Sequence, residues 1–92
     1  MLKLKFVVTH PAGLHARPAS LFVKTCNSFP CEIRVKNLTT GSNEVNAKSV
    51  LAVLTLGVDS GHEVFVSANG DKEKDALDAI KALVDTNFGE PA

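Results

Sequence analysis

The sequence predicts an α+β fold, an open-faced β-sandwich in which three helices cover one face of a four-stranded sheet. Segments whose apolar residues recur every three or four positions predict amphipathic helices, and segments of alternating apolar and polar residues predict strands. Turn residues separate these segments and give the order β-α-β-β-α-β-α. Such a sheet buries one core beneath its helices. The 92 residues are expected to form a single domain over 1–92.

The first two predicted elements are a strand and a helix. Apolar and polar residues alternate over 2–9, which predicts a half-buried strand with an apolar side formed by Leu2, Leu4, Phe6 and Val8. Pro and Gly break the chain at 10–13. A helix is expected from Ala16 to Asn27, because Pro18 is well tolerated in a first helical turn. Its apolar face at helical spacing is formed by Ala19, Phe22, Val23 and Cys26.

A hairpin and a short apolar segment are expected next. A strand over 32–38, a turn at 39–42 and a return strand over 44–47 together predict the hairpin. Ser49 precedes and Gly57 follows the apolar run 50–56. Serine before and glycine after such a run are typical helix caps, which favours a helix here. A buried strand stays open as the alternative, because the run is apolar nearly all round.

A strand and a helix complete the predicted fold. The strand covers 63–68, and Asn69 and Gly70 turn the chain. Asp71 is expected to cap a helix over 72–85, whose core stripe is Ala76, Leu77, Ile80, Leu83 and Val84. The tail 87–92 is expected to fray.

Composition argues against several classes of function. Ten basic and ten acidic residues give a net charge of zero, and the chain has neither Trp nor Tyr. Nucleic-acid binding is therefore not expected, since it depends on excess basic charge and on stacked aromatic residues. No leader sequence is expected at the start, and no apolar run is long enough to insert into a membrane. Cys26 and Cys31 are expected to be reduced thiols in a cytoplasmic protein.

The segment Gly13-Leu14-His15-Ala16-Arg17-Pro18-Ala19 carries the functional signal. His15 lies just before the predicted helix, beside backbone N–H groups that attract anions. Arg17 follows two residues later and brings a guanidinium to the same place. The sequence therefore predicts a histidine that is phosphorylated, with the phosphoryl oxygens bound by the N–H groups of Ala16 and Arg17. The three histidines lack metal-ligand spacing, so neither a metal nor a cofactor is expected.

The chain closely resembles HPr, the histidine-containing phosphocarrier family of the bacterial phosphoenolpyruvate-dependent sugar phosphotransferase system. The resemblance rests on the His15 segment, on Lys48-Ser49-Val50-Leu51 followed by Leu56-Gly57, and on 64–71 with the helix after it. It implies an antiparallel sheet of strand order 1-4-2-3. It also implies that His15 accepts a phosphoryl group on Nδ1 from enzyme I and passes it to sugar-specific IIA domains. Such a protein is a carrier without a substrate pocket of its own, not an enzyme.

The sequence departs from the family pattern in three places. Ala12 stands where many members have a small polar residue that contacts the phosphate, which leaves more of that task to the backbone and Arg17. The connection around 39–43 is longer than usual. Ala52 stands where glycine is frequent, which weakens the case for recognition by a serine kinase. The sugar, and the choice among the general, fructose and nitrogen branches, stay open.

Two roles are open for Ser49. It is expected to cap the short helix, and the resemblance suggests that it is also a regulatory phosphosite, with a serine kinase/phosphorylase and transcriptional regulators as further partners. Such a regulatory binding protein is the main alternative to a carrier, and the presence of His15 and Arg17 favours the carrier.

A transient docking surface is expected around His15 on a monomer that alternates between partners. Leu51 is the first choice for an exposed apolar contact. Lys24 and Lys48 are expected at the rim, where they would steer acidic partners. The remaining candidate docking residues could surround His15 if the first two helices lie side by side, and some of them are expected to belong to the core instead: Leu14, Phe22, Leu54 and Thr55.

Overall fold

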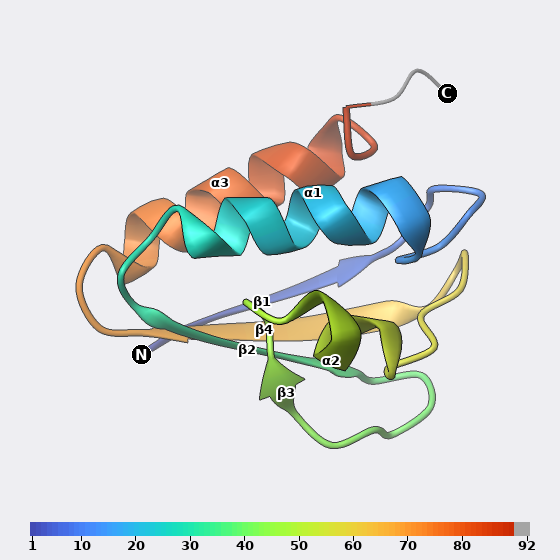
Figure 1. Cartoon of the computed structure of the whole chain (residues 1–92), viewed down its shortest axis with the longest axis horizontal. Coiled ribbons are helices and arrows are strands. Elements are labelled where there is room, and N and C mark those ends of the chain that lie inside the picture. Colours follow the sequence, from blue (N-terminus) through green and yellow to red (C-terminus); the bar gives the residue numbers. More distant parts are fainter. Residues whose placement is uncertain (90–92) are drawn as a thin grey trace.

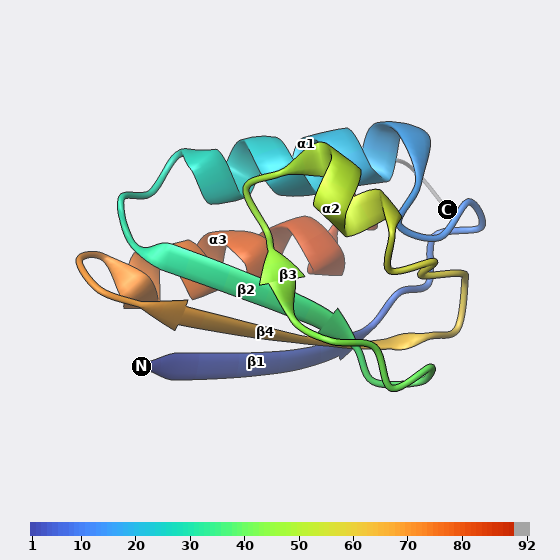
Figure 2. The same cartoon turned by 60° about the horizontal axis from the view of Figure 1, so that its bottom comes forward.

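The computed structural model describes residues 1–89 and has the predicted element order (Figure 1). Helices α1 and α3 lie side by side on one face of the sheet, and the short α2 lies beside α1 (Figures 1 and 2). The elements are β1 (Leu2–Val7), α1 (Ala16–Asn27), β2 (Glu32–Asn37), β3 (Val45–Asn46), α2 (Val50–Leu54), β4 (Glu63–Asn69) and α3 (Glu73–Asp85).

The sheet is antiparallel throughout and has the order β1-β4-β2-β3, which confirms the predicted topology. Phe65 at the middle of β4 pairs with Lys5 of β1 on one side and with Lys36 of β2 on the other. Residues one position along point to the opposite face and are buried: Val64 and Val66 in β4 are fully inaccessible. This alternation leaves one face of the sheet open and packs the other against the helices.

The core lies between this inner face and the helices. Helix α1 contributes Ala19, Phe22 and Cys26, all with 0% exposure, as its apolar spacing predicts. The inner face of the sheet contributes buried β-branched side chains from β2 and β4: Ile33, Val35, Val64 and Val66. Helix α1 therefore has one buried face and one solvent-exposed face, and His15 lies at its N-terminal end.

The segment after Ser49 is a helix, so the strand alternative does not hold. The Ser49 Oγ accepts a hydrogen bond from the backbone N–H of Ala52 at 3.3 Å, which satisfies one of the N–H groups that a helix leaves without an intrahelical partner. Only Val53 of this helix is buried. The helix ends at Leu54, and Gly57, with a left-handed backbone (φ 60), turns the chain shortly after it.

The expectation that Asp71 caps α3 is wrong. The residue before the helix is Lys72, which has a left-handed backbone (φ 63) and makes no side-chain capping bond. Glu73, the first residue of the helix, instead binds the turn before it: its Oε1 accepts the Gly70 N–H at 3.2 Å. That bond is the first cause of a lowered pKa of the Glu73 carboxyl, and the neighbouring Met1 amino group lowers it further.

The expectation of a frayed tail is wrong for the part of it that the structure describes. Asn87 and Phe88 both have a left-handed backbone, with φ 54 and φ 57, and turn the chain back over the fold. Phe88 is 1% exposed, and its N–H donates to the Leu83 carbonyl at 2.8 Å. Residues 90–92 lie outside the described residues. Within residues 1–89, no helix is long and apolar enough to cross a membrane.

Candidate functional site

His15 is the N-cap residue of α1, with an extended backbone of φ −126 and ψ 168. Its side chain makes no capping hydrogen bond to the helix and is 38% exposed. The imidazole therefore projects beside the first turn of α1, where backbone N–H groups point out of the helix. A half-exposed ring at a positive helix end can react with a partner and then hold a negatively charged group.

The backbone on either side of His15 turns sharply. Gly13 has φ 68, and Ala16 has φ 47 although it is not a glycine. A left-handed alanine costs about 1–2 kcal/mol, so the surrounding structure has to hold it. Leu14 anchors this backbone, because its side chain is fully buried and its N–H donates to the Val58 carbonyl at 2.8 Å.

Asp59 contacts His15 and was missed by the sequence reasoning. Its Oδ1 lies 3.2 Å from the His15 Nε2, although the two residues are 44 positions apart. Asp59 is in the loop between α2 and β4, which packs against the loop before α1. No local pattern could have indicated this pair, since it depends on how two loops meet in three dimensions.

Arg17 and the backbone N–H groups of Ala16 and Arg17 lie in the first turn of α1, as predicted. Arg17 is exposed, and the first turn contains no acidic residue. The helix end and the guanidinium both contribute positive charge, a combination that stabilises a phosphoryl group.

Four of the seven predicted docking residues are exposed, on α2, just after it and on α1. Leu51 is 75% exposed and Leu54 is 38% exposed. Thr55 and, on α1, Lys24 are also exposed. Val50, which the sequence reasoning did not select, adds a further apolar residue to this surface at 39% exposure.

Two of the predicted docking residues are in the core, so the prediction that they contact partners is wrong. Leu14 and Phe22 are both 0% exposed, so neither can touch a partner in the folded protein. The physical reason is that Leu14 anchors the loop before α1, while Phe22 lies on the buried stripe of that helix. Lys48 is half-buried, and its ammonium donates to the Phe29 carbonyl at 2.6 Å, which directs it to the C-terminal end of α1.

Comparison with known proteins identifies the family. The family model described as "PTS HPr component phosphorylation site" matches residues 2–86, a range that contains His15, Arg17 and Ser49. The chain belongs to the HPr family. HPr proteins are phosphocarriers of the phosphotransferase system and not enzymes with an independent reaction.

Relatives of two lengths match the chain. It is 35% identical to the phosphocarrier protein HPr of Mycoplasma pneumoniae, over 92% of this chain and 94% of that protein. It is also 38% identical to the multiphosphoryl transfer protein of Salmonella typhimurium. The matched region covers all of this chain but only 24% of that longer protein.

Solved HPr structures share the fold. A crystal structure of HPr-C-His from Thermoanaerobacter tengcongensis matches with a TM-score of 0.93 at 39% identity, over 100% of both chains. An HPr structure from Bacillus anthracis matches with a TM-score of 0.82 at 31% identity, over 90% of this chain and 95% of that one.

The other two histidines of this HPr-family chain form hydrogen bonds within the fold, and both of its thiols are buried. His10 is buried, and its Nδ1 accepts the Ala12 N–H at 3.0 Å. The His62 Nδ1 accepts the Asp59 N–H at 3.2 Å.

Cys26 and Cys31 are free and buried, and burial raises the pKa of the Cys26 thiol to about 12. Within residues 1–89, no cluster of three or more His, Cys, Asp or Glu side chains could hold a metal ion.

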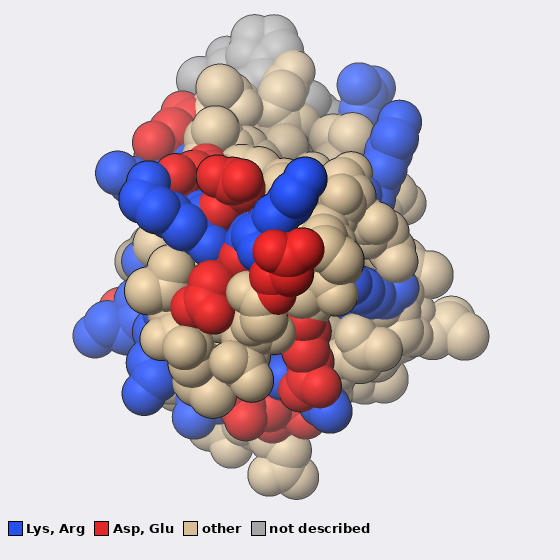
Figure 3. Space-filling view, turned by 90° about the vertical axis from the view of Figure 1, so that its left-hand side faces the viewer, with Lys and Arg blue, Asp and Glu red and all other residues tan. Residues whose placement is uncertain are grey.

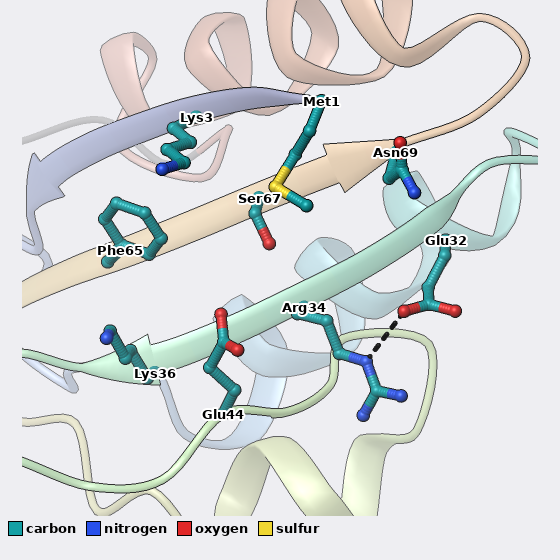
Figure 4. A pocket seen from close by; sticks show the side chains of 9 residues that line it. All are labelled: Met1, Lys3, Glu32, Arg34, Lys36, Glu44, Phe65, Ser67 and Asn69. Carbon is teal, nitrogen blue, oxygen red and sulfur yellow. Dashed lines mark hydrogen bonds and ion pairs between the residues drawn. The ribbon is translucent and has the colours of Figure 1, made fainter.

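A hollow of about 520 Å³ lies far from His15 in the fold, on the open face of the sheet (Figure 4). Two of its three basic side chains contact neighbouring residues: Arg34 pairs with Glu32 at 3.1 Å, and the Lys36 ammonium lies 5.2 Å from the Phe65 ring centre. Acidic and basic side chains are also intermixed at the end of the molecule opposite the start of α1 (Figure 3). Neither surface presents a concentrated charge of one sign.

Proposed function

We propose that this HPr-family chain accepts a phosphoryl group derived from phosphoenolpyruvate, through enzyme I, on His15 and donates it to sugar-specific IIA domains in carbohydrate uptake. The carrier would act in the cytoplasm as a monomer. One observation carries the proposal: the 38% exposed His15 imidazole stands uncapped at the N-terminus of α1, inside the segment that the HPr phosphorylation-site model matches.

The proposed transfer passes between two histidines. The Nδ1 lone pair of a neutral His15 ring forms the new N–P bond, while the donor's N–P bond breaks and leaves its electron pair on the donor nitrogen. The phosphoryl oxygens would then accept hydrogen bonds from the N–H groups of Ala16 and Arg17, at a helix end that favours negative charge. The Arg17 guanidinium would stabilise the charge as the phosphoryl group passes.

Partner docking is proposed on the exposed side of α1 and α2. Leu51 and Leu54 supply apolar area there, and α2 packs beside α1, whose N-cap is His15. Lys24 and Thr55 are exposed and would lie at the rim. Since enzyme I and a IIA domain use the same histidine, they would bind this surface in turn.

Ser49 is proposed as a second, regulatory phosphosite. A half-buried Oγ that caps α2 would carry a phosphate at a helix N-terminus, where negative charge is stabilised. The same charge would lie next to Leu51 and would oppose docking of partners to that surface. A serine kinase/phosphorylase would set this state, and transcriptional regulators would be its readers.

The deciding experiment is a phosphorylation assay with the whole chain. The purified protein is incubated with enzyme I, magnesium and phosphoenolpyruvate, and its intact mass is measured at neutral to alkaline pH. One acid-labile phosphoryl group on the wild type and none on the His15→Ala variant is the expected result. If an active cognate enzyme I leaves the wild type unmodified, the carrier function is rejected.

The Arg17→Ala variant tests the proposed electrostatic role in the same assay. Loss of one charged donor at a reacting group typically slows a reaction by about 10²-fold. Arg17 is exposed, so the free energy of unfolding is expected to change by less than about 0.5 kcal/mol. Transfer at the wild-type rate would show that Arg17 has no such role.

A further inference from the structure

We propose that Asp59 is a positioning residue for His15: its carboxylate accepts the Nε2–H and holds the ring in the tautomer that leaves the Nδ1 lone pair free. This inference rests on the proposed function, because it concerns how the same histidine is prepared for attack on phosphorus. Neither the HPr-like segment around His15 nor the Ser49 segment contains Asp59.

The contact itself defines the tautomer. His15 Nε2 and Asp59 Oδ1 are 3.2 Å apart, within hydrogen-bonding distance. An ionised carboxylate can only accept hydrogen bonds, so Nε2 must be the nitrogen that carries the hydrogen. In a neutral imidazole the other nitrogen then has the lone pair. That nitrogen is Nδ1, the atom assigned to the attack.

Backbone contacts fix the loop that carries Asp59. The Asp59 N–H donates to the His62 Nδ1 at 3.2 Å, and the His62 N–H donates back to the Asp59 carbonyl at 3.0 Å. These two bonds close a tight turn between α2 and β4. The Asp59 side chain therefore extends from a backbone that is held at both of its polar groups.

The same loop is joined to the loop that carries His15. Leu14, the neighbour of His15, donates its N–H to the Val58 carbonyl at 2.8 Å. Gly13 approaches so closely that a side chain there would overlap the Val58 carbonyl oxygen and lie 2.8 Å from the Asp59 Cα. The residues directly before His15 and directly around Asp59 are thus in contact, which sets the distance between the two side chains.

The Asp59 carboxylate is compatible with phosphoryl transfer both to and from His15, because the charge of the ring changes during the transfer. When Nδ1 forms its bond to phosphorus, the donor's N–P bond breaks, and the His15 ring becomes positively charged while it keeps its Nε2–H. Asp59 stabilises that charge through the hydrogen bond, as an orienting aspartate does for a catalytic histidine. The positive phosphoimidazole remains a good leaving group, so the reverse breakage of the N–P bond returns the electron pair to Nδ1.

The expected size of the effect is modest, because both side chains contact water. Asp59 is 70% exposed and His15 is 38% exposed. Exposed ion pairs of this kind typically change an equilibrium by up to about fivefold. Removal of the carboxylate is therefore expected to change the tautomer ratio and the transfer rate by about three- to fivefold.

The test measures the tautomer directly and the rate separately. Nitrogen-15 NMR of the His15 ring, at a pH where the ring is neutral, is compared between wild type, Asp59→Ala, Asp59→Asn and the matched loop control Ser60→Ala. Asp59→Ala should lower the Nε2–H to Nδ1–H ratio by about three- to fivefold. Asp59→Asn, which keeps an accepting oxygen, should retain more of the bias, and Ser60→Ala should match the wild type.

The kinetic measurement separates this inference from the proposed function. Asp59→Ala should slow phosphoryl transfer to His15 by about three- to fivefold without a change in unfolding midpoint. A wild-type tautomer ratio in Asp59→Ala overturns the inference, and so does a shifted ratio with an unchanged transfer rate. Failure of enzyme I to phosphorylate the wild type would reject the carrier function, whereas the NMR comparison would still decide whether Asp59 sets the tautomer.

Discussion

Phe88 packs edge-on against His10, with the ring centres 6.3 Å apart and the ring planes at 79°. His10 lies in the loop between β1 and α1, and its Nδ1 accepts the N–H of Ala12 three residues before His15. The C-terminal turn therefore supports, through one aromatic contact, the loop that leads into the candidate site. Edge-to-face aromatic pairs contribute about 0.5–1.5 kcal/mol beyond the area that they bury.

Phe88→Ala is predicted to destabilise the whole fold. A phenylalanine that is 1% exposed leaves a cavity when it is truncated, and such changes cost about 3–5 kcal/mol. Urea denaturation should show the loss, and Leu51→Ala, at a 75% exposed position, should stay within about 0.5 kcal/mol of the wild type. A Phe88→Ala variant as stable as Leu51→Ala would mean that the tail does not pack as described.

The sequence was informative where a local pattern encodes the structure. Helix α1 follows from apolar residues three and four positions apart, and the Ser49 cap follows from a serine before an apolar run. The packed tail was not predicted, because no local pattern indicates a left-handed backbone at a phenylalanine such as Phe88. Within the site, the motif indicated His15, but its contact with Asp59 depends on packing between distant loops.

The same limit explains the two docking residues that turned out to be buried. Leu14 stands next to His15 in the sequence, and it was expected to surround His15 together with residues of the first two helices. An extended backbone points neighbouring side chains to opposite sides, so an exposed His15 accompanies a buried Leu14. For Phe22 the sequence itself indicated a core position, since this residue also lies on the apolar stripe of α1.

Gly13→Ala is predicted to be more damaging than Gly57→Ala. Both glycines have a left-handed backbone, with φ 68 and φ 60, so both variants incur about 1–2 kcal/mol of backbone strain. The added methyl group meets open space at Gly57 but overlaps the Val58 carbonyl at Gly13, which adds about 1–3 kcal/mol. Thermal or urea unfolding of the pair measures the difference. Equal losses would show that the two loops are not in close contact.

The buried thiol of Cys26 predicts a loss of stability at alkaline pH. Its pKa is about 12 in the folded protein, because burial disfavours the thiolate, while an unfolded cysteine titrates near about 8.5. Below the pKa of the unfolded cysteine, the thiol is neutral in both states, and the full free energy of unfolding is retained. As pH rises from about 8.5 towards 12, the unfolded chain ionises first, and the free energy of unfolding falls by about 1.4 kcal/mol per pH unit.

Cys26→Ala isolates this effect. The variant is expected to be less stable than the wild type at pH 7, because it leaves a small cavity, but to lose less stability between pH 8.5 and 11. Cys31 and all lysines are common to both proteins and cancel in the comparison. Urea unfolding across this pH range gives the two curves, and parallel curves would contradict the raised pKa.

Ser49 variants separate its cap from its proposed regulation. Ser49→Ala removes the acceptor for the Ala52 N–H and should cost about 1 kcal/mol of stability. Ser49→Asp keeps an accepting oxygen and adds a negative charge at the helix N-terminus, so its stability should stay close to that of the wild type. Unfolding measurements rank the three proteins. If Ser49→Asp unfolds as easily as Ser49→Ala, the cap does not stabilise α2 as proposed.

Leu51→Glu is predicted to weaken binding of both proposed partners without affecting the fold. At 75% exposure the side chain contributes little to the core, so the free energy of unfolding should change by less than about 0.5 kcal/mol. In a docked complex the new carboxylate would be desolvated without a partner, and an apolar contact would be lost. Such central contacts are worth about 2 kcal/mol, so dissociation constants should rise about 30-fold.

The matched control is Ala82→Glu, which places the same charge at an exposed position of α3. Calorimetric titration with enzyme I and with a IIA domain then compares three proteins of closely similar stability. Weaker binding of both partners by Leu51→Glu alone would support one shared surface, since a general charge effect would change Ala82→Glu equally. Weakening for one partner only would instead mean that enzyme I and the IIA domain approach His15 over different contacts, with Leu51 belonging to just one of them.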